Sequence, residues 1–273
     1  MSLRLMKRIA VGLTVLHGAG VHAQPTEQVV IDGDRAVMPL VVALANDFKI
    51  RAREVGFVFE KDLGDLRLEA VLQGKLDIAV ATNGIDLAFI SREGMVAYPI
   101  ARSAVVFAVH SGVPVGNLTK RQICDIYGGL IANWKSLGGP DLAIAPHSPP
   151  GRHVDTQVVR RATLCLRGLR MGEVVRIIGQ SQGMVRALAS TRGAIGITSP
   201  ISVEESAGRL RSVSIEGVAP SADNVQHRRY GMIRETFFVT WSAPSPAVER
   251  FLRFVRSSEG DKLIRVNGAV PAK

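Results

Sequence analysis

Short apolar runs alternate with amphipathic segments in the first part of the chain. Residues 29–31, 55–59 and 76–81 are apolar runs bounded by polar residues or glycine, which predicts buried strands. Residues 39–50 and 66–73, which lie between these runs, carry apolar side chains at helical spacing. Strands that alternate with helices predict an α/β fold with a mostly parallel sheet covered on both faces.

Two longer extended segments interrupt this alternation. Residues 98–110 form a long apolar run suited to a strand that crosses between two lobes, and residues 235–241 alternate as a second crossing strand would. Bending is expected around residues 105–109 and 237–241. The chain has no repeat, low-complexity segment or long linker, so we predict two α/β lobes joined by two hinge strands. The expected boundaries are 24–103 plus 235–273 for lobe I and 104–234 for lobe II.

Further segments in the second half of the chain are bounded by glycine, proline or polar residues. They predict strands at 142–145 and 193–198, and helices at 154–166, 183–190, 246–257 and 259–266. The last two helices return the chain to lobe I.

Residues 118–139 contain the clearest local signals. Thr119 can cap a helix with an apolar stripe, and the pair Gly128-Gly129 ends it. A short loop follows, closed by Trp134 and a double glycine. No catalytic chemistry is visible in this stretch, and we expect Trp134 and also Trp241 to pack in the core or hinge rather than stack on a ligand.

The first 23 residues have the three parts of a secretory signal. Three basic residues come first, residues 9–16 form an apolar run, and residues 21–23 offer small side chains before a cleavage site. The apolar run is too short to span a bilayer. No cysteine follows it closely, so we predict a soluble exported protein with a cleavable signal peptide at residues 1–23, not a lipoprotein.

The chain carries 34 Lys and Arg against 24 Asp and Glu, a formal net charge of +10 at pH 7. Loss of the signal removes three basic residues and leaves +7. Nucleic-acid binding needs a concentrated basic stripe with stacking side chains, whereas the basic residues here are scattered and aromatics are few. The charge therefore argues against nucleic acid as a partner, and indicates a solvated exterior or a field that draws anions toward a cleft.

Cys124 and Cys165 are the only cysteines in the sequence. In an oxidising compartment they could pair and close a loop of about 40 residues, which is worth roughly 3–4 kcal/mol. Both also lie in apolar stretches, which is typical of buried thiols on helix faces. The sequence leaves both interpretations open.

The order of these signals resembles the periplasmic phosphate-binding proteins of ABC importers. Residues 118–139 resemble the family's signature of leucine-threonine, a helix, tyrosine-glycine, isoleucine-x-asparagine-tryptophan and leucine-glycine-glycine. Residues 77–79, 193–198 and 251–271 resemble its aspartate-isoleucine strand, its glycine-alanine-isoleucine-glycine strand and its closing segment. The resemblance covers the whole mature chain. It implies a type II periplasmic-binding fold, a periplasmic monomer, a ligand held in the cleft between the lobes, and an ABC permease as partner.

The loops that bind phosphate in that family differ here. The resemblance implies ligand contacts from the first turn, from the loop before the second helix, from the end of the third strand and from one loop of the other lobe. In this sequence those positions are Asp34, Arg35, Ala36, Asp65, Thr82, Asn83, Gly151, Arg152 and His153. Carboxylates replace hydroxyls at Asp34 and Asp65, and His147 falls at the position of the family's arginine.

These replacements change the ligand that the cleft can hold. Helix N-termini favour an oxyanion through their free N–H groups, but aspartates at such positions can accept those groups themselves. An aspartate within about 4 Å of a phosphate costs on the order of 4 kcal/mol at an effective dielectric near 20, whereas arginine can offset that cost by gripping oxyanions through two parallel bonds. Three interpretations remain open: phosphate bound in the family's manner, another small anion or zwitterion, and an accessory protein that has lost tight binding.

Residues 179–183 match the nucleophile elbow G-x-S-x-G, and Asp223 and His227 follow in the order that a secreted esterase would need. The match is weak, because an HGGG-type oxyanion loop is missing and Asp223 lies only four residues from His227. We therefore expect Ser181 to cap a helix and the protein not to be an enzyme. The histidines are dispersed and no HExxH, CxxC or P-loop motif occurs, so neither a metal nor a cofactor is expected.

Overall fold

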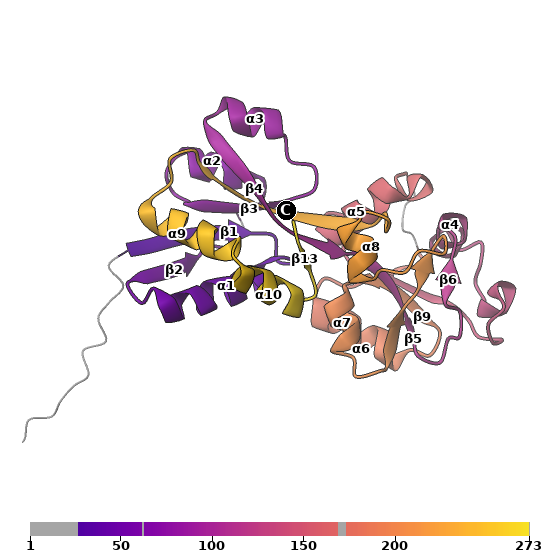
Figure 1. The fold of residues 1–273 in the computed structure, drawn as a ribbon. Coiled ribbons are helices and arrows are strands. Elements are labelled where there is room, and N and C mark those ends of the chain that lie inside the picture. Colours follow the sequence, from indigo (N-terminus) through magenta and orange to yellow (C-terminus); the bar gives the residue numbers. More distant parts are fainter. Residues whose placement is uncertain (1–26, 62, 169–172, 273) are drawn as a thin grey trace, which may run out of the picture.

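The computed structural model describes residues 27–61, 63–168 and 173–272, which form two α/β lobes (Figure 1). Lobe I contains a six-stranded sheet, and lobe II contains a five-stranded sheet with a separate two-stranded one. The predicted signal peptide, residues 1–23, lies outside the described residues. Within the described ranges, none of the helices has the length and apolar character needed to cross a membrane. The predicted two-lobed α/β fold is confirmed, and the lobe boundaries stay a prediction.

The sheet of lobe I is mixed rather than mostly parallel. In spatial order its strands are β13 (Val270–Pro271), β4 (Met95–Ala104), β12 (Ile233–Trp241), β3 (Ile78–Thr82), β1 (Glu27–Gly33) and β2 (Val55–Phe59). β1 runs parallel to β2 and β3, as the alternation of strands and helices predicted. β12 is antiparallel to β3 and β4 because it returns from lobe II and inserts between them.

Helices cover both faces of this sheet, as predicted. One face carries α1 (Met38–Arg51), α9 (Pro246–Val255) and α10 (Ser258–Val266), and the other carries α2 (Arg67–Leu72) and α3 (Leu87–Arg92). Phe48, Phe238 and Phe251 meet in the core of the first face. The central strands are buried from both sides for this reason, which explains their nearly continuous apolar sequence.

Lobe II has its own mixed sheet. In spatial order the strands are β10 (Leu210–Ser212), β5 (Val106–His110), β9 (Ala194–Thr198), β7 (Ala145–Ser148) and β8 (Arg176–Ile177), and β6 (Asn117–Leu118) pairs with β11 (Ser214–Ile215). The helices are α4 (Lys120–Tyr127), α5 (Val154–Ala162), α6 (Ser181–Ser190), α7 (Pro200–Glu204) and α8 (Ala222–Gln226), with 3-10 turns at Trp134–Leu137 and Leu164–Leu166.

Two predicted boundaries in lobe II are wrong. β7 begins at Ala145 instead of residue 142, because Ala143 forms only an isolated bridge with Asn133. The helix predicted at 154–166 ends at Ala162, because Thr163 is extended with φ −131° and ψ 94°. Both errors concern apolar stretches whose local pattern does not distinguish a loop from a regular element.

The signature stretch stabilises the scaffold of lobe II. Thr119 and Gln122 form a capping box at the start of α4. Trp134 is fully buried in the core, and its Nε1–H donates to the carbonyl oxygen of Gly193 at 2.9 Å. A Cβ atom at Gly193 would overlap the carbonyl oxygen of Ala143, so this position needs glycine. The signature therefore ties its loop to the start of β9.

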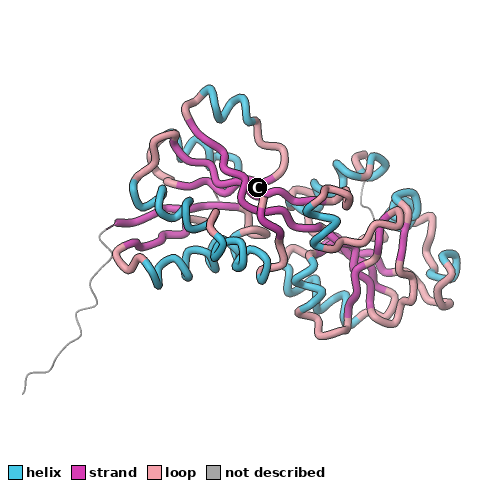
Figure 2. Tube along the Cα trace, viewed as in Figure 1, coloured by secondary structure: helices cyan, strands magenta, loops and turns pink. Residues whose placement is uncertain are grey.

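The two passages between the lobes lie side by side at the waist of the molecule (Figure 2). β4 continues through Val105 into β5, as residues 98–110 predicted. The return passage runs through Tyr230 and Met232: the Val105 N–H donates to the Met232 carbonyl oxygen at 2.8 Å, and the Tyr230 hydroxyl donates to the Val105 carbonyl oxygen at 3.0 Å. The predicted second hinge at 237–241 is wrong, because β12 stays paired with β4 as far as Trp241.

A disulfide joins Cys124 on α4 to Cys165 in the turn Leu164–Leu166, with the Cα atoms 6.1 Å apart. Of the two interpretations that the sequence left open, this structure has the bonded form. Both cysteines belong to lobe II, so the cross-link leaves the relative movement of the lobes unconstrained.

Reduction of this disulfide should lower the melting temperature. Two cysteines 41 positions apart close a loop that is worth about 3–4 kcal/mol through the entropy of the unfolded chain, which for a chain of this length is a fall of roughly 6–16 °C. Calorimetry with and without dithiothreitol measures the change. The double variant Cys124→Ser/Cys165→Ser is the control and should not respond to the reductant. An unchanged melting temperature of the wild-type protein would contradict the prediction.

Candidate functional site

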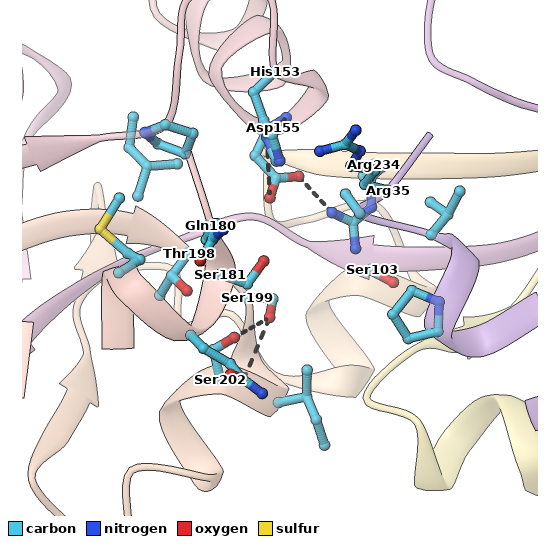
Figure 3. Close-up of a pocket in the computed structure, with 18 of the residues that line it drawn as sticks. Arg35, Ser103, His153, Asp155, Gln180, Ser181, Thr198, Ser199, Ser202 and Arg234 are labelled. Carbon is cyan, nitrogen blue, oxygen red and sulfur yellow. Dashed lines mark hydrogen bonds and ion pairs between the residues drawn. The ribbon is translucent and has the colours of Figure 1, made fainter. Parts of the chain in front are cut away.

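Two of the cavities between the lobes border the predicted ligand loops. The first has a volume of about 300 Å³ and is bordered by the start of α1 and strands β4 and β12 of lobe I, and by the starts of α5, α6 and α7 of lobe II (Figure 3). The second, of about 290 Å³, lies between the loops that precede α2 and α3 in lobe I and helix α5 in lobe II.

The structure divides the predicted ligand residues between these cavities instead of gathering them. The first cavity is lined by Arg35, Ala36 and His153. The second is lined by Asp34, Asp65, Thr82, Asn83 and Arg152. Gly151, the remaining predicted residue, borders neither of these two cavities. The loops converge on the cleft, but neighbouring residues of one loop face different sides of it.

Asp34 precedes the N-cap Val37 of α1 and accepts N–H groups from the turn that leads into the helix. The Asp34 carboxylate accepts the Ala36 N–H at 2.9 Å, and the Asp34 carbonyl oxygen accepts the N–H groups of Val37 and Met38 at 3.0 and 3.2 Å. Pro39, the next residue, has no N–H to offer. Asp34 therefore takes up the donors that an anion would otherwise use at this helix start.

Charged contacts within the protein surround the second cavity. The buried Asp32 accepts a hydrogen bond from Arg67 Nε at 2.6 Å. Asp65 is exposed and lies inside the 3-10 turn before α2, not at its cap. The Arg161 guanidinium of lobe II lies against Gly84 of lobe I, where any Cβ would overlap it. Two of the arginines at this cavity thus already contact protein atoms.

Asn83 serves the scaffold. Its side-chain nitrogen donates to the Ile233 carbonyl oxygen at 2.9 Å, and its side-chain oxygen accepts the Glu235 N–H at 2.8 Å. Both partners lie on β12 just after the return passage. Each end of the Asn83 amide therefore has a protein partner, and the residue fastens the loop after β3 to the crossing strand.

A buried ion pair joins α5 to β12 at the first cavity. Asp155 in the first turn of α5 lies 2.5 Å from Arg234 Nη1, and each side chain is 8% exposed. Among the described residues the Arg234 Nε has no hydrogen-bond partner. The sequence does not reveal this pair, because the two residues are 79 positions apart. A charged residue at the start of an apolar strand was the one available signal.

His147 cannot supply the positive charge of the arginine that it replaces in the resemblance. The residue is buried in β7, and its Nδ1–H donates to the Ala145 carbonyl oxygen at 2.8 Å. Burial lowers the pKa of the imidazole, and the nearby Arg176 lowers it too, against the opposing effect of backbone hydrogen bonds. The ring is therefore neutral near pH 7.

Hydroxyl and amide groups that the sequence analysis did not assign to a ligand line the first cavity. Ser103 and Thr236 come from the strands of lobe I, and Thr198 from the end of β9, and all three are largely buried. Gln180 and Ser181 lie at the start of α6. The signal for them was present, because strand ends and helix starts of α/β folds meet at such clefts.

The structure does not bring together Ser181, Asp223 and His227, the three residues that a secreted esterase would need. Ser181 is the first residue of α6 rather than its cap, which is Gln180. His227 pairs with Asp223 on α8, with 3.0 Å between Nδ1 and Oδ1, and Asp223 borders a separate depression beside α10. α6 and α8 lie well apart in lobe II (Figure 1). The described part of the chain also holds no group of three or more His, Cys, Asp or Glu placed to bind a metal ion.

Comparison with known proteins agrees with this architecture. Residues 20–259 match the PBP superfamily domain. The phosphate-binding protein PstS of Bacillus subtilis is 26% identical over 250 residues, which cover 88% of this chain and 79% of that protein. A phosphate ABC transporter substrate-binding protein from Clostridium perfringens, solved with bound phosphate, superposes with a TM-score of 0.77 at 24% identity, over 90% of this chain and 100% of that chain.

An ABC-type phosphate transport receptor from Vibrio cholerae superposes with a TM-score of 0.72 at 21% identity, over 89% of this chain and 99% of that one. At these identities the superpositions show the fold, whereas the domain match spans most of the chain. The scaffold is that of a solute-binding protein similar to the phosphate-binding proteins, with distant homology to PstS. This chain belongs to the PBP superfamily.

Proposed function

We propose that this chain is an exported, periplasmic solute-binding protein of an ABC importer, which acts as a monomer and holds a small anionic or zwitterionic ligand between its lobes. The observation that carries the proposal is the presence of cavities lined by helix starts from both lobes. The relatives named for phosphate binding and ABC transport support the transport role. The ligand closes the lobes by bending at Val105 and Met232, and the closed form docks on a permease.

Three features favour a ligand other than phosphate held in the family's manner. Asp34 and Asp65 place two carboxylates on the second cavity, and each costs on the order of 4 kcal/mol within about 4 Å of a phosphate charge. Asp34 also occupies the N–H groups at the start of α1. His147 is neutral where the resemblance has a cation. A ligand with a single negative charge and a further polar or positive group fits these charges better.

A second candidate is an accessory protein on the same scaffold that has lost tight ligand binding. The specific observation in its favour is that several polar groups of the cleft have partners within the protein. Asp155 pairs with Arg234, the Asp34 carboxylate accepts the Ala36 N–H, and both ends of the Asn83 amide are bonded. A cleft with internal partners can persist without a solute, and the protein would then act through contacts with another protein.

A ligand of the cleft should raise the melting temperature. At 100 times its dissociation constant it stabilises by about 2.7 kcal/mol, which is roughly 5–11 °C for a chain of this length. Calorimetry of the mature protein with phosphate, sulfate, molybdate and single amino acids measures the shift. Trp fluorescence is a poorer probe, because Trp134 lies in the core of lobe II. Trp241 is 38% exposed rather than packed as expected, and it pairs with Met95 at the end of β12 opposite the return passage. Flat melting curves across the panel would contradict solute binding and favour the accessory protein.

His147 should make the protein less stable in acid. Because its pKa is lowered from 6.5 in the folded state, the unfolded chain binds a proton that the folded chain does not, and stability falls as the pH decreases below 6.5. His147→Gln keeps an amide donor near the Ala145 carbonyl oxygen but does not titrate. Between about pH 7.5 and about pH 5.5 the variant should lose less melting temperature than the wild-type protein. Equal losses in both proteins would show that His147 titrates normally.

A further inference from the structure

The charges that line the first cavity cancel. Arg35 and Arg234 are cationic, and Asp155 and Glu205 are anionic. A dianion therefore gains little net attraction there, whereas a molecule with one carboxylate and a polar body meets no net repulsion. The volume of about 300 Å³ equals the room of about ten water molecules at ~30 Å³ each, so the cavity has space for an organic body besides one acidic group.

The start of α6 is the open anion site of this cavity. α6 has 10 residues, and its N-cap Gln180 makes no side-chain capping bond to any described residue. The first N–H groups of a helix have no partner inside the helix, and they carry the positive end of its dipole. The starts of α5 and α7 differ, because the side chains of His153 and Ser199 cap them.

Arg234 is an independent sign that an anion belongs here. The residue is 6% exposed and lines the same cavity, and its Nε has no hydrogen-bond partner in the described part of the chain. Asp155 meets the guanidinium through Nη1, which is the dashed line between the two in Figure 3. The Nε is itself buried, so an acceptor contacts it only after the side chain shifts, whereas the guanidinium at the cavity wall matches the geometry of a carboxylate.

The other walls suit a small organic body. The hydroxyls of Ser103, Thr198 and Thr236 offer donors and acceptors, while Leu40 and Ile197 add apolar surface. A few convergent polar groups on a partly apolar wall are typical of sites for small organic ligands.

We propose that the first cavity is the ligand site and that its ligand is a small organic carboxylate of the size of an amino acid or a hydroxy acid. The carboxylate lies between the start of α6 and Arg234, and the body meets Ser103, Thr198 and Thr236. This inference rests on the proposed function. It assigns the ligand to the first cavity, beside α6, and not to the second cavity, which Asp65 and Arg152 line.

The variant Ser181→Asp tests the site. Ser181 is exposed, and a carboxylate at the first position of a helix interacts favourably with the positive end of the helix dipole. Without ligand, the variant should therefore melt at or above the wild-type temperature. The same charge repels a bound carboxylate, so calorimetric titration with L-serine, L-lactate and succinate should show binding at least about tenfold weaker than in Ser181→Asn, which has similar size and no charge. Gln28→Glu, which adds a charge at an exposed position of β1, should bind as the wild-type protein does.

The titrations also separate the two proposals. Preference for L-serine or for L-lactate identifies an amino acid or a hydroxy acid as the source of the carboxylate. Equal binding by Ser181→Asp and Ser181→Asn, with loss in Arg152→Gln, would place the ligand in the second cavity and overturn this inference while solute binding stands. Binding of inorganic phosphate alone would also overturn the organic carboxylate as the ligand, while solute binding stands. Absence of binding by every probe, organic and inorganic, would contradict both proposals.

Discussion

The buried pair of Asp155 and Arg234 is the contact on which the arrangement of the cleft depends. Two charges taken out of water are tolerated when their mutual geometry is good, and this pair meets at 2.5 Å although the Arg234 Nε has no partner among the described residues. Here one partner begins α5 and the other lies on β12 just after the return passage, so the pair sets the position of the lobe II helix starts relative to the strands of lobe I. Both cavities have α5 as a wall, and their separate lining follows from where this helix is held.

The scaffold and its ligand chemistry are built from different residues. Trp134, Gly193 and the capping box of α4 stabilise lobe II and face the core. The ligand loops instead carry residues that satisfy one another, such as Asp34 with the start of α1. A chain can therefore keep the signature that identifies its relatives while the cleft changes the solute that it accepts.

The sequence predicted the scaffold well and the site poorly, for physical reasons. Local signals such as Thr119, the glycine pair after α4 and the run through Val105 determine local structure, and all three are confirmed. The return hinge was misplaced because alternation along β12 does not reveal that neighbouring strands pair with it on both sides. The pair of Asp155 and Arg234 depends on tertiary packing, which no spacing encodes. The predicted ligand residues came from the right loops, but loop order does not specify which side of a cleft each side chain faces.

Gly84 has a consequence for how closely the two halves can approach. The guanidinium of Arg161 occupies the space that a side chain at Gly84 would need. A Cβ atom there would displace this flexible side chain, and the backbone at Gly84 has a φ of +91°, which L side chains rarely adopt. Glycine at position 84 therefore meets two requirements at once, a left-handed turn in lobe I and the close approach of a cation from lobe II.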